Sequence, residues 1–440
     1  MFNKSSLLFS LFLALSAAST PAVIARTSPT PNTLTKSYHS TNGGSIAKAD
    51  QTRATHLRKQ ALKPIGKRAS GPAPANNQVV LYTANLTVGD VHNVTLLIDT
   101  GSSTTSCTGQ KCSVRNPTGE GEMLMYGSAQ FIGQETVQSV EFGQYQVQNQ
   151  SVAIGTFDRG LAPFDGILGL GPTDLNEGTR LLNKSAVSTF ADNLVSEGRI
   201  ERNVVGIYYS PTVKGGEDNG EITFGAIDTS KCSGELKYVP ITNSSPANKY
   251  WGVDASVTYN NGLLLNSTAG IVDTGTTLVL LSTDAFNRYV EATGATKDEA
   301  TGLLSIPASS YGQLHSLNFK IGGFTFEMTP DSQVWPQSLN ECIGGRNDAM
   351  YLIIGDLGAF GGTGLDFILG YTFLERFYSV YDMSLKQIGL CSTSNTFRVT
   401  NSRPSTEGSA FCSQVPVAPP ARVGPALPVA NNTTAVSPSQ

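Results

Sequence analysis

Short apolar stretches separated by turn residues dominate the chain between about residue 75 and residue 397. Many of them are rich in β-branched and aromatic residues and end at Gly, Asn or Pro, a pattern typical of β-strands. The clearest predicted strands are residues 78–86, 136–142, 204–209, 221–224, 319–326 and 376–381. Helical signals are few, and the best are residues 188–197 and 283–292, which begin at a hydroxyl residue and are followed closely by Gly. The pattern therefore predicts an all-β body.

Two of the apolar stretches nearly repeat each other. Residues 95–103 read TLLIDTGSS and residues 269–277 read AGIVDTGTT. An Asp at the end of a buried strand is costly unless it is hydrogen-bonded, and the neighbouring hydroxyl residues can supply those bonds. An Ile-Leu-Gly string follows each segment in the same order, at 167–169 and at 368–370. The ordered repeat indicates two halves that each deliver one carboxylate, from Asp99 and from Asp273, to a shared place.

Two carboxylates at hydrogen-bond distance share one proton over a broad acidic range, because their repulsion separates their pKa values. The ionised Asp can then take a proton from water while the protonated Asp polarises a carbonyl, which is hydrolysis without a metal. Competing signals are missing: the sequence has no Gly-x-Ser-x-Gly motif and no phosphate loop, and we expect no cofactor. A zinc site is not expected, because the four His residues are scattered: His39, His56, His92 and His315.

These motifs resemble those of the pepsin-type aspartic endopeptidases, most of all the secreted fungal enzymes of the polyporopepsin kind. The resemblance covers about residues 75–397 and includes FDGILGLG at 164–171 and FILGYTFLERFY at 367–378. It implies a bilobal all-β pepsin-like fold, with two pseudo-symmetric lobes around a cleft, that acts on polypeptide substrates. It also implies that Asp99 and Asp273 are the catalytic pair. The residues implied to support them are Thr100, Gly101, Ser102, Thr274, Gly275 and Thr276.

The family closes its cleft with a β-hairpin flap that carries a Tyr-Gly pair, and Tyr126, Gly127 and Ser128 fit that role. One departure is Ser106, which stands where the family usually has a Trp near the flap. A catalytically silent pepsin-fold protein that binds another protein is the alternative. Both Asp-Thr-Gly motifs are intact, which favours the enzyme.

The two ends of the chain differ in composition from its body. Residues 1–18 are typical of a secretory signal peptide, and residues 19–68 form a basic segment ending at Lys67-Arg68, a candidate processing site. We expect an N-terminal lobe at 75–240, a C-terminal lobe at 241–397 and a disordered Pro/Ser/Thr-rich tail at 398–440. No membrane anchor is expected, and the protein is predicted to be secreted rather than vacuolar, and to be a monomer.

Charge is divided unevenly along the chain. The formal net charge is −4, and residues 1–68 hold ten Lys or Arg and one acid, so this part carries +9 and the rest carries −13. The basic segment is therefore predicted to bind the acidic body as an intramolecular inhibitor, with Lys63 or Lys67 beside the Asp pair. The acidic body also argues against binding to nucleic acid.

Six cysteines in an oxidising compartment predict disulfides. Cys107 is expected to pair with Cys112, and Cys342 with Cys391, while the sequence alone leaves the pairing of the last four cysteines open, with Cys232 and Cys412 as the other two. Glycosylation sequons also suit a secreted protein. They occur at Asn85, Asn93, Asn149, Asn183, Asn243, Asn266, Asn431 and Asn432.

Overall fold

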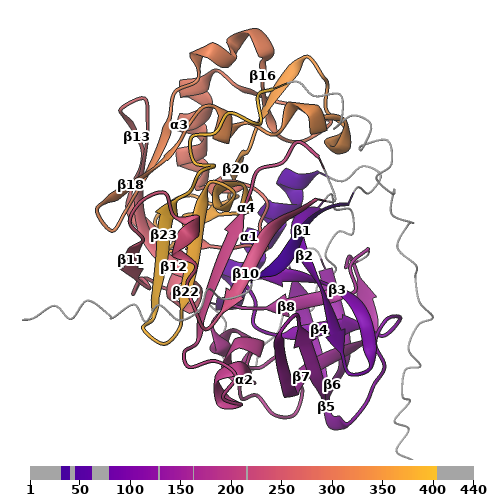
Figure 1. Ribbon diagram of the computed structural model, residues 1–440. Helices are drawn as coiled ribbons and strands as arrows, with labels where there is room; N and C mark the ends of the chain where they lie inside the picture. The colour runs from indigo at the N-terminus through magenta and orange to yellow at the C-terminus, as the bar shows by residue number, and fades with distance from the viewer. Residues whose placement is uncertain are drawn as a thin grey trace, which may run out of the picture.

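The structure is a computed structural model that describes residues 31–39, 45–61, 79–126, 129–161, 163–214 and 217–403. Two β-rich lobes lie one above the other in Figure 1. A 13-stranded sheet runs through the lower lobe in the order β11-β23-β22-β9-β10-β1-β2-β3-β8-β4-β7-β6-β5. The upper lobe holds a seven-stranded sheet, β18-β17-β12-β13-β21-β14-β20, and a three-stranded sheet, β15-β16-β19. The all-β, two-lobed fold predicted from the sequence is confirmed.

The large sheet combines strands from both ends of the described chain. Its consecutive body strands are β2 (Val79–Val88), β3 (Val91–Asp99), β4 (Thr105–Thr108), β5 (Pro117–Tyr126), β6 (Ala129–Phe142), β7 (Tyr145–Arg159), β8 (Gly166–Gly169), β9 (Val204–Tyr209), β10 (Asp218–Phe224) and β11 (Lys237–Pro240). Two strands, β22 (Phe377–Asp382) and β23 (Gln387–Ser392), return to it after the chain has built the upper lobe. The large sheet therefore ties the two lobes together.

The upper lobe is built from shorter strands. They are β12 (Gly252–Tyr259), β13 (Gly262–Val272), β14 (Val279–Leu281), β15 (Thr296–Lys297), β16 (Leu304–Pro307), β17 (Leu317–Ile321), β18 (Phe324–Met328), β19 (Ala349–Leu352), β20 (Ile354–Asp356) and β21 (Phe367–Leu369). The single strand predicted at 319–326 is wrong: β17 and β18 form a hairpin there. Gly322 and Gly323 make the turn with φ of 56° and 86°, values that favour glycine.

Helices are few and short, as the sequence predicts. They are α1 (Ile46–Ala61), α2 (Phe190–Ser196), α3 (Thr283–Thr293) and α4 (Tyr371–Leu374), with 3₁₀ turns at η1 (Thr173–Asn176), η2 (Thr229–Lys231), η3 (Ala247–Lys249), η4 (Ala308–Gln313), η5 (Asp331–Gln333), η6 (Gln337–Leu339) and η7 (Glu341–Ile343). Thr189 caps α2 through a reciprocal pair of hydrogen bonds with Asp192. Gly294, with a φ of 66°, ends α3.

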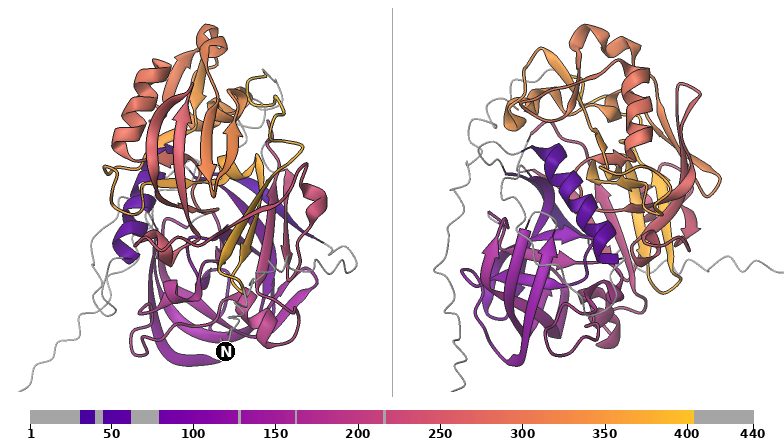
Figure 2. Two further views of the ribbon diagram at one scale, coloured as in Figure 1. Left: turned by 90° about the vertical axis from the view of Figure 1, so that its left-hand side faces the viewer. Right: turned by 180° about the vertical axis from the view of Figure 1, so that it is seen from behind.

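The described parts of the basic front segment, residues 31–39 and 45–61, are folded, which the sequence did not predict. Strand β1 (Asn32–His39) lies inside the large sheet and pairs antiparallel with β10 on one side and β2 on the other. Its Lys36 is 1% exposed and donates a hydrogen bond of 2.7 Å to the buried carboxylate of Glu375, which also accepts from Tyr82 Oη at 2.9 Å. The 16-residue helix α1 follows and packs between the lobes (Figure 2).

Two disulfides join described residues. Cys107 is bonded to Cys112, as the sequence predicts. The predicted pairing of Cys342 with Cys391 is wrong, because Cys391 is bonded to Cys232. Strand β11 pairs with β23, and Ser233 N donates to Ser392 O at 2.8 Å, so these two cysteines meet with their Cα atoms 5.6 Å apart. Cys412 lies outside the described residues.

The structure describes the start of the predicted tail, through residue 403. The buried carboxylate of Asp331 accepts from the backbone N–H groups of Thr400, Asn401 and Ser402, and from Arg376 Nη2 at 3.0 Å. The ordered body therefore extends past residue 397, the boundary expected from composition. Residues 404–440 lie outside the described part of the chain.

Candidate active site

The two sequence repeats form equivalent structures in the two lobes. Asp99 ends β3, which pairs parallel with β8, so Asp99 lies opposite Gly169 of the first Ile-Leu-Gly string. Asp273 follows β13, which pairs parallel with β21, so Val272 lies opposite Leu369 of the second string. Each Asp therefore lies at a matched position at the end of a buried strand. The Ile-Leu-Gly string is repeated because in each lobe it forms the strand beside the Asp-bearing strand.

Matched donors hold each carboxylate. Asp99 Oδ2 accepts from Ser102 Oγ at 2.7 Å, and its Oδ1 accepts from Gly101 N at 2.9 Å. In the other lobe, Asp273 Oδ2 accepts from Thr276 Oγ1 at 2.6 Å and its Oδ1 accepts from Gly275 N at 3.0 Å. Charge-assisted bonds of this kind stabilise buried ionised carboxylates. The side chains of Asp99 and Asp273 are 3% and 0% exposed.

The two Asp-bearing loops are bonded to each other through their threonines. Thr100 N donates to Thr274 Oγ1 at 3.0 Å, and Thr274 N donates to Thr100 Oγ1 at 3.0 Å. Each hydroxyl then donates to the strand of the opposite lobe, Thr274 Oγ1 to Ile98 O at 2.8 Å and Thr100 Oγ1 to Val272 O at 3.4 Å. This reciprocal arrangement fixes the separation of the two carboxylates.

A guanidinium from α1 occupies the space between the two aspartates. Arg53 Nη2 lies 2.6 Å from Asp99 Oδ1 and 3.0 Å from Asp273 Oδ1, while Arg53 Nε lies 2.8 Å from Asp273 Oδ2. One nitrogen therefore bonds both carboxylates at once. The side chain of Arg53 is 11% exposed, so this is a buried ion triad.

The glycines of the two motifs make room for this contact. A Cβ on Gly101 would lie 2.5 Å from Arg53 Nη2 and 2.6 Å from Asp273 Oδ1. A Cβ on Gly275 would collide with Arg53 Nη2 and Asp99 Oδ1. Real Cβ atoms do not approach heavy atoms so closely, so both positions require glycine.

The pair does not titrate as two ordinary carboxyls. Burial raises the pKa of Asp99, and the charge of Arg53 offsets this only in part. Burial acts the same way on Asp273, but the charge and hydrogen bonds of Arg53 outweigh it and lower the pKa of Asp273. In this arrangement Asp273 is therefore the more readily ionised of the two.

A third carboxylate, Asp50, lies one helical turn before Arg53 and is 5% exposed. It accepts from Leu278 N at 2.7 Å, just past the second Asp-Thr-Gly motif. Burial raises its pKa to about 7, and the N–H groups of Leu278 and Thr277 and the charge of Arg53 only partly offset the rise. Helix α1 thus brings a basic and an acidic side chain to the two Asp-Thr-Gly motifs.

Helix α1 lies between the two lobes (Figure 2) and is hydrogen-bonded to both. Ser45 Oγ, just before it, donates to Thr301 O at 2.6 Å, and Gln51 Nε2 donates to Asp356 Oδ2 at 3.2 Å, both in the upper lobe. Gln60 Nε2 donates to Leu175 O of the lower lobe at 3.1 Å. The helix therefore spans the position that substrate would have to reach.

The sequence analysis expected Lys63 or Lys67 at this position, and it missed Arg53. Lys63 and Lys67, like Arg68, lie outside the described residues, and the cation between the carboxylates is Arg53. The signal for α1 in the sequence is weak, because two of its five buried positions are alanines. The buried residues are Ile46, Ala49, Asp50, Ala54 and Leu57.

Of the predicted flap residues, Tyr126 is described: it ends β5 and pairs with Ala129, the first residue of β6. Gly127 and Ser128 lie outside the described residues. Ser106, at the position of the family's usual Trp, is fully buried on β4 opposite Ile167. The hairpin and the first Asp-Thr-Gly motif therefore belong to the same sheet and the same lobe.

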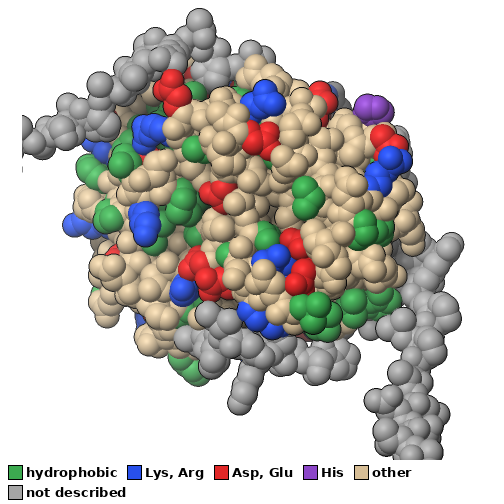
Figure 3. Space-filling view, turned by 90° about the horizontal axis from the view of Figure 1, so that it is seen from below, with side chains coloured by type: hydrophobic (Ala, Val, Ile, Leu, Met, Phe, Trp, Pro, Cys, Tyr) green, Lys and Arg blue, Asp and Glu red, His purple; other side chains and the backbone are tan. Residues whose placement is uncertain are grey.

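Two further observations bear on other functions. Among the described residues, no group of three His, Cys, Asp or Glu side chains is placed to hold a metal ion. On the face seen from below, basic and acidic side chains lie next to one another rather than in a field of one sign (Figure 3).

Comparisons with known proteins agree with this geometry. The sequence profile of the family described as "Eukaryotic aspartyl protease" matches residues 81–393. Polyporopepsin of Irpex lacteus is 46% identical over 340 residues, which cover 76% of this chain and 100% of that protein. Rhizopuspepsin-4 of Rhizopus niveus is 30% identical over 312 residues, covering 68% and 70% of the two chains. The crystal structure of the aspartic proteinase from Irpex lacteus matches with a TM-score of 0.72, covering 73% of this chain and 96% of that one.

The fold, with its two lobes and facing Asp-Thr-Gly loops, defines an aspartic protease of the pepsin type. The chain belongs to the eukaryotic aspartyl protease family and is an aspartic-type endopeptidase, similar to polyporopepsin. The alternative of a silent binding protein is therefore not needed.

Proposed function

We propose that Asp99 and Asp273 are the catalytic pair of this endopeptidase and that they activate a water for attack on a peptide carbonyl. The observation that carries the proposal is that Arg53 Nη2 lies within 3.0 Å of oxygens from both carboxylates. A water oxygen at the position of Arg53 Nη2 would lie within hydrogen-bond distance of both carboxylates and could exchange protons with either Asp. The matched donors on each carboxylate and the reciprocal threonine bonds support the same assignment.

The proposed reaction uses one ionised and one protonated Asp. The ionised carboxylate removes a proton from water, whose oxygen forms a bond to the carbonyl carbon of the substrate. The protonated carboxyl hydrogen-bonds the carbonyl oxygen, where negative charge develops. A proton then passes to the amide nitrogen, the C–N bond breaks, and the pair is left again with one proton.

Asp99→Asn and Asp273→Asn test this directly. Each should lower kcat by more than about a thousandfold, on the order of 4 kcal/mol of barrier, because each removes half of the proton-sharing pair. So that the front segment does not mask the result, each variant is cleaved with immobilised wild-type enzyme, which is removed before the assay. Asp174→Asn, a surface carboxylate paired with Lys249, is the control. Near-normal hydrolysis by folded Asp273→Asn would refute the two-aspartate mechanism.

We further propose that the protein is made as a zymogen whose front segment is the inhibitor. Arg53 lies where the reacting water is needed, and α1 bonds both lobes around it. Docking of Arg53 lowers the pKa of Asp273, so the docked state resists protonation of that carboxyl. Acidification therefore favours release, because protonated Asp273 no longer attracts Arg53. Cleavage after Lys67-Arg68 would then make release permanent.

The remaining expectations concern export and chain organisation. A signal peptide at 1–18, lobes at 75–240 and 241–397 and a tail beyond them remain our proposal. Within the described part of the chain, no helix is long and apolar enough to span a membrane. Glycosylation is supported by the exposure of every sequon asparagine in the described body. These are Asn85, Asn93, Asn149, Asn183, Asn243 and Asn266.

We also propose that the β5–β6 hairpin is the flap and that Tyr126 lies over bound substrate. The support is its position at the tip of a hairpin in the lobe of Asp99. A flap of this kind excludes water and completes the site when it closes.

A further inference from the structure

The hairpin proposed as the flap begins at an edge of the large sheet. Strand β5 is the last strand in the order, so one of its sides has no strand partner in the sheet. An unpaired edge frays easily, because its N–H and C=O groups lack cross-strand bonds. What fixes the hairpin on that side therefore decides how well its tip is positioned.

The segment 179–185 covers this edge. Met123 N donates to Thr179 O at 3.1 Å, and Leu181 N donates to Gly121 O at 2.9 Å, with Glu122 opposite Arg180 in an antiparallel bridge. These bonds extend to Met123, three residues before Tyr126 ends the strand. The tip of the hairpin therefore projects from a clamped base.

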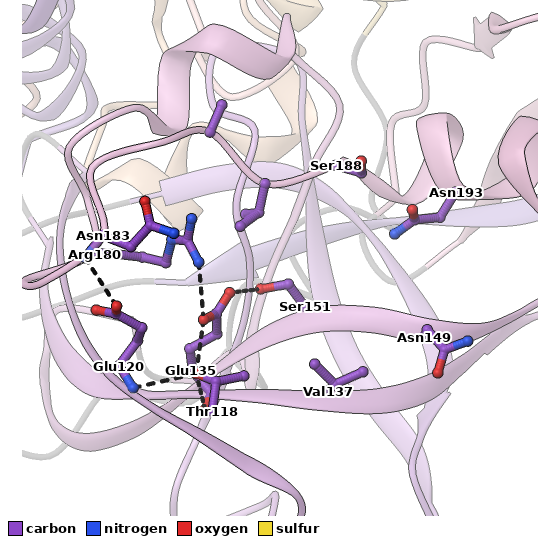
Figure 4. A pocket seen from close by; sticks show the side chains of 12 residues that line it. Thr118, Glu120, Glu135, Val137, Asn149, Ser151, Arg180, Asn183, Ser188 and Asn193 are labelled. Carbon is purple, nitrogen blue, oxygen red and sulfur yellow. Dashed lines mark hydrogen bonds and ion pairs between the residues drawn. The ribbon is translucent and has the colours of Figure 1, made fainter.

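Carboxylates reinforce the clamp from both strands of the hairpin (Figure 4). Glu120 of β5 accepts from Leu182 N at 3.0 Å and from Asn183 N at 2.9 Å. Glu135 of β6, only 3% exposed, accepts from Arg180 Nη1 at 3.3 Å. Arg180 Nη2 donates to Ser185 O at 2.8 Å, so its guanidinium joins the ends of its own segment to the hairpin.

Glu135 connects this clamp to three strands. It accepts from Thr118 Oγ1 of β5 at 2.8 Å and from Ser151 Oγ of β7 at 2.6 Å. Together with Arg180 these side chains line a polar hollow of about 570 Å³ at the base of the hairpin. The side chain of Arg180 is 11% exposed, so its ion pair with Glu135 is shielded from solvent.

We propose that Arg180 is a positioning residue for the reaction: through Glu135 it holds the β5–β6 hairpin in the orientation from which its tip closes on substrate. This rests on the proposed role of the hairpin as the flap. The fork of an arginine can bond Glu135 and Ser185 together, which the single ammonium of a lysine cannot do in the same geometry. Removal of Arg180 also leaves a buried carboxylate without its cation.

The test compares mature enzyme carrying Arg180→Met, Arg180→Lys and the control Arg115→Met. Arg115 forms an exposed ion pair with Asp90 in the same lobe, and such pairs contribute little. Arg180→Met should raise KM and lower kcat together, reducing kcat/KM by up to about a hundredfold, because misplaced groups lose that much. Arg180→Lys should recover part of the loss. Rates are expressed per active site. The concentration of active sites is titrated with a tight-binding peptide inhibitor, so that unfolded protein is not included.

Hydrogen exchange locates the cause. In Arg180→Met, the amides of Met123 and Leu181 should exchange at least about tenfold faster, while amides of β2 and β3 keep their protection. If Arg180→Met folds poorly, Glu135→Gln with Arg180→Met removes the unpaired charge and should restore folding but not KM.

The outcomes separate the two proposals. Unchanged KM and kcat in Arg180→Met, with or without faster exchange at Met123, would overturn the positioning role. Tyr126→Ala is measured in parallel, because it tests the flap itself. A loss of activity in Tyr126→Ala but not in Arg180→Met would refute the clamp alone, and no loss in either would refute the flap assignment on which it rests.

Discussion

Replacing Arg53 in the intact precursor should release its activity. Arg53 makes three charge-assisted hydrogen bonds to two buried carboxylates. Breaking a buried ion pair by removing one partner costs about 3–5 kcal/mol. Arg53→Leu should therefore shift the equilibrium between docked and released α1 by about 10²- to 10⁴-fold toward release.

The assay follows hydrolysis of a fluorogenic peptide by the precursor at pH 6, using initial rates and confirming by intact mass that residues before Lys67 are still present. The wild-type precursor should be silent, and Arg53→Leu should hydrolyse the peptide at once. Arg53→Lys should fall between them, because an ammonium cannot reproduce the forked contact. Lys59→Leu is the matched control, since Lys59 is a basic, exposed residue of the same helix.

The reasoning fails if uncleaved Arg53→Leu is as silent as the wild type from pH 3 to pH 7 while a peptide inhibitor also fails to bind. An Arg53→Leu precursor that binds the inhibitor but does not hydrolyse the peptide would instead show that the site is open and that the substitution has impaired the Asp99–Asp273 pair. Thermal melting of all three variants excludes the trivial explanation that the lobes have unfolded.

Three further outcomes follow from the same contacts. Asp50→Asn should strengthen latency at pH 7 but not at pH 4. Burial raises the pKa of Asp50 to about 7, so above that pH its charged form opposes docking of α1. The free-energy cost of burying this charge falls as the pH falls from about 7 toward the ordinary pKa of 3.8. The activation rate should therefore depend more steeply on pH in Asp50→Asn than in the wild type. An unchanged pH profile would contradict this role of Asp50. Lys36→Met should lower precursor stability by about 3–5 kcal/mol in denaturant unfolding, and Glu375→Gln in addition should recover part of it, because the pair is buried. Cys232→Ser with Cys391→Ser should cost about 2–5 kcal/mol by the same measurement.

The sequence indicated the paired aspartates because their signal is local. Nine residues contain the whole pattern: an apolar strand, an Asp with hydroxyl neighbours and a glycine that admits close contact. The pattern occurs twice, at 95–103 and 269–277. The hydrogen bonds of Ser102 and Thr276 follow from that spacing. All-β composition and turn residues predicted the fold class for the same reason.

Features that depend on distant strands could not be predicted in the same way. The pairing of Cys232 with Cys391 depends on β11 lying beside β23, which no local pattern announces. Which of ten basic residues reaches the carboxylates depends on where α1 docks, so charge alone did not single out Arg53. The break at Gly322-Gly323 was a local signal, but the apolar residues on both sides suggested one continuous strand.

The disulfide between Cys232 and Cys391 has a consequence for the lifetime of the enzyme. The two cysteines are 159 residues apart, and the chain between them builds nearly the whole upper lobe, including Asp273. An endopeptidase is always exposed to its own activity, and loops are the sites that are cut first. A single cut anywhere in that lobe leaves both fragments covalently joined, so neither fragment can diffuse away with its part of the site. Nicked molecules should therefore remain countable as active sites until the disulfide is reduced.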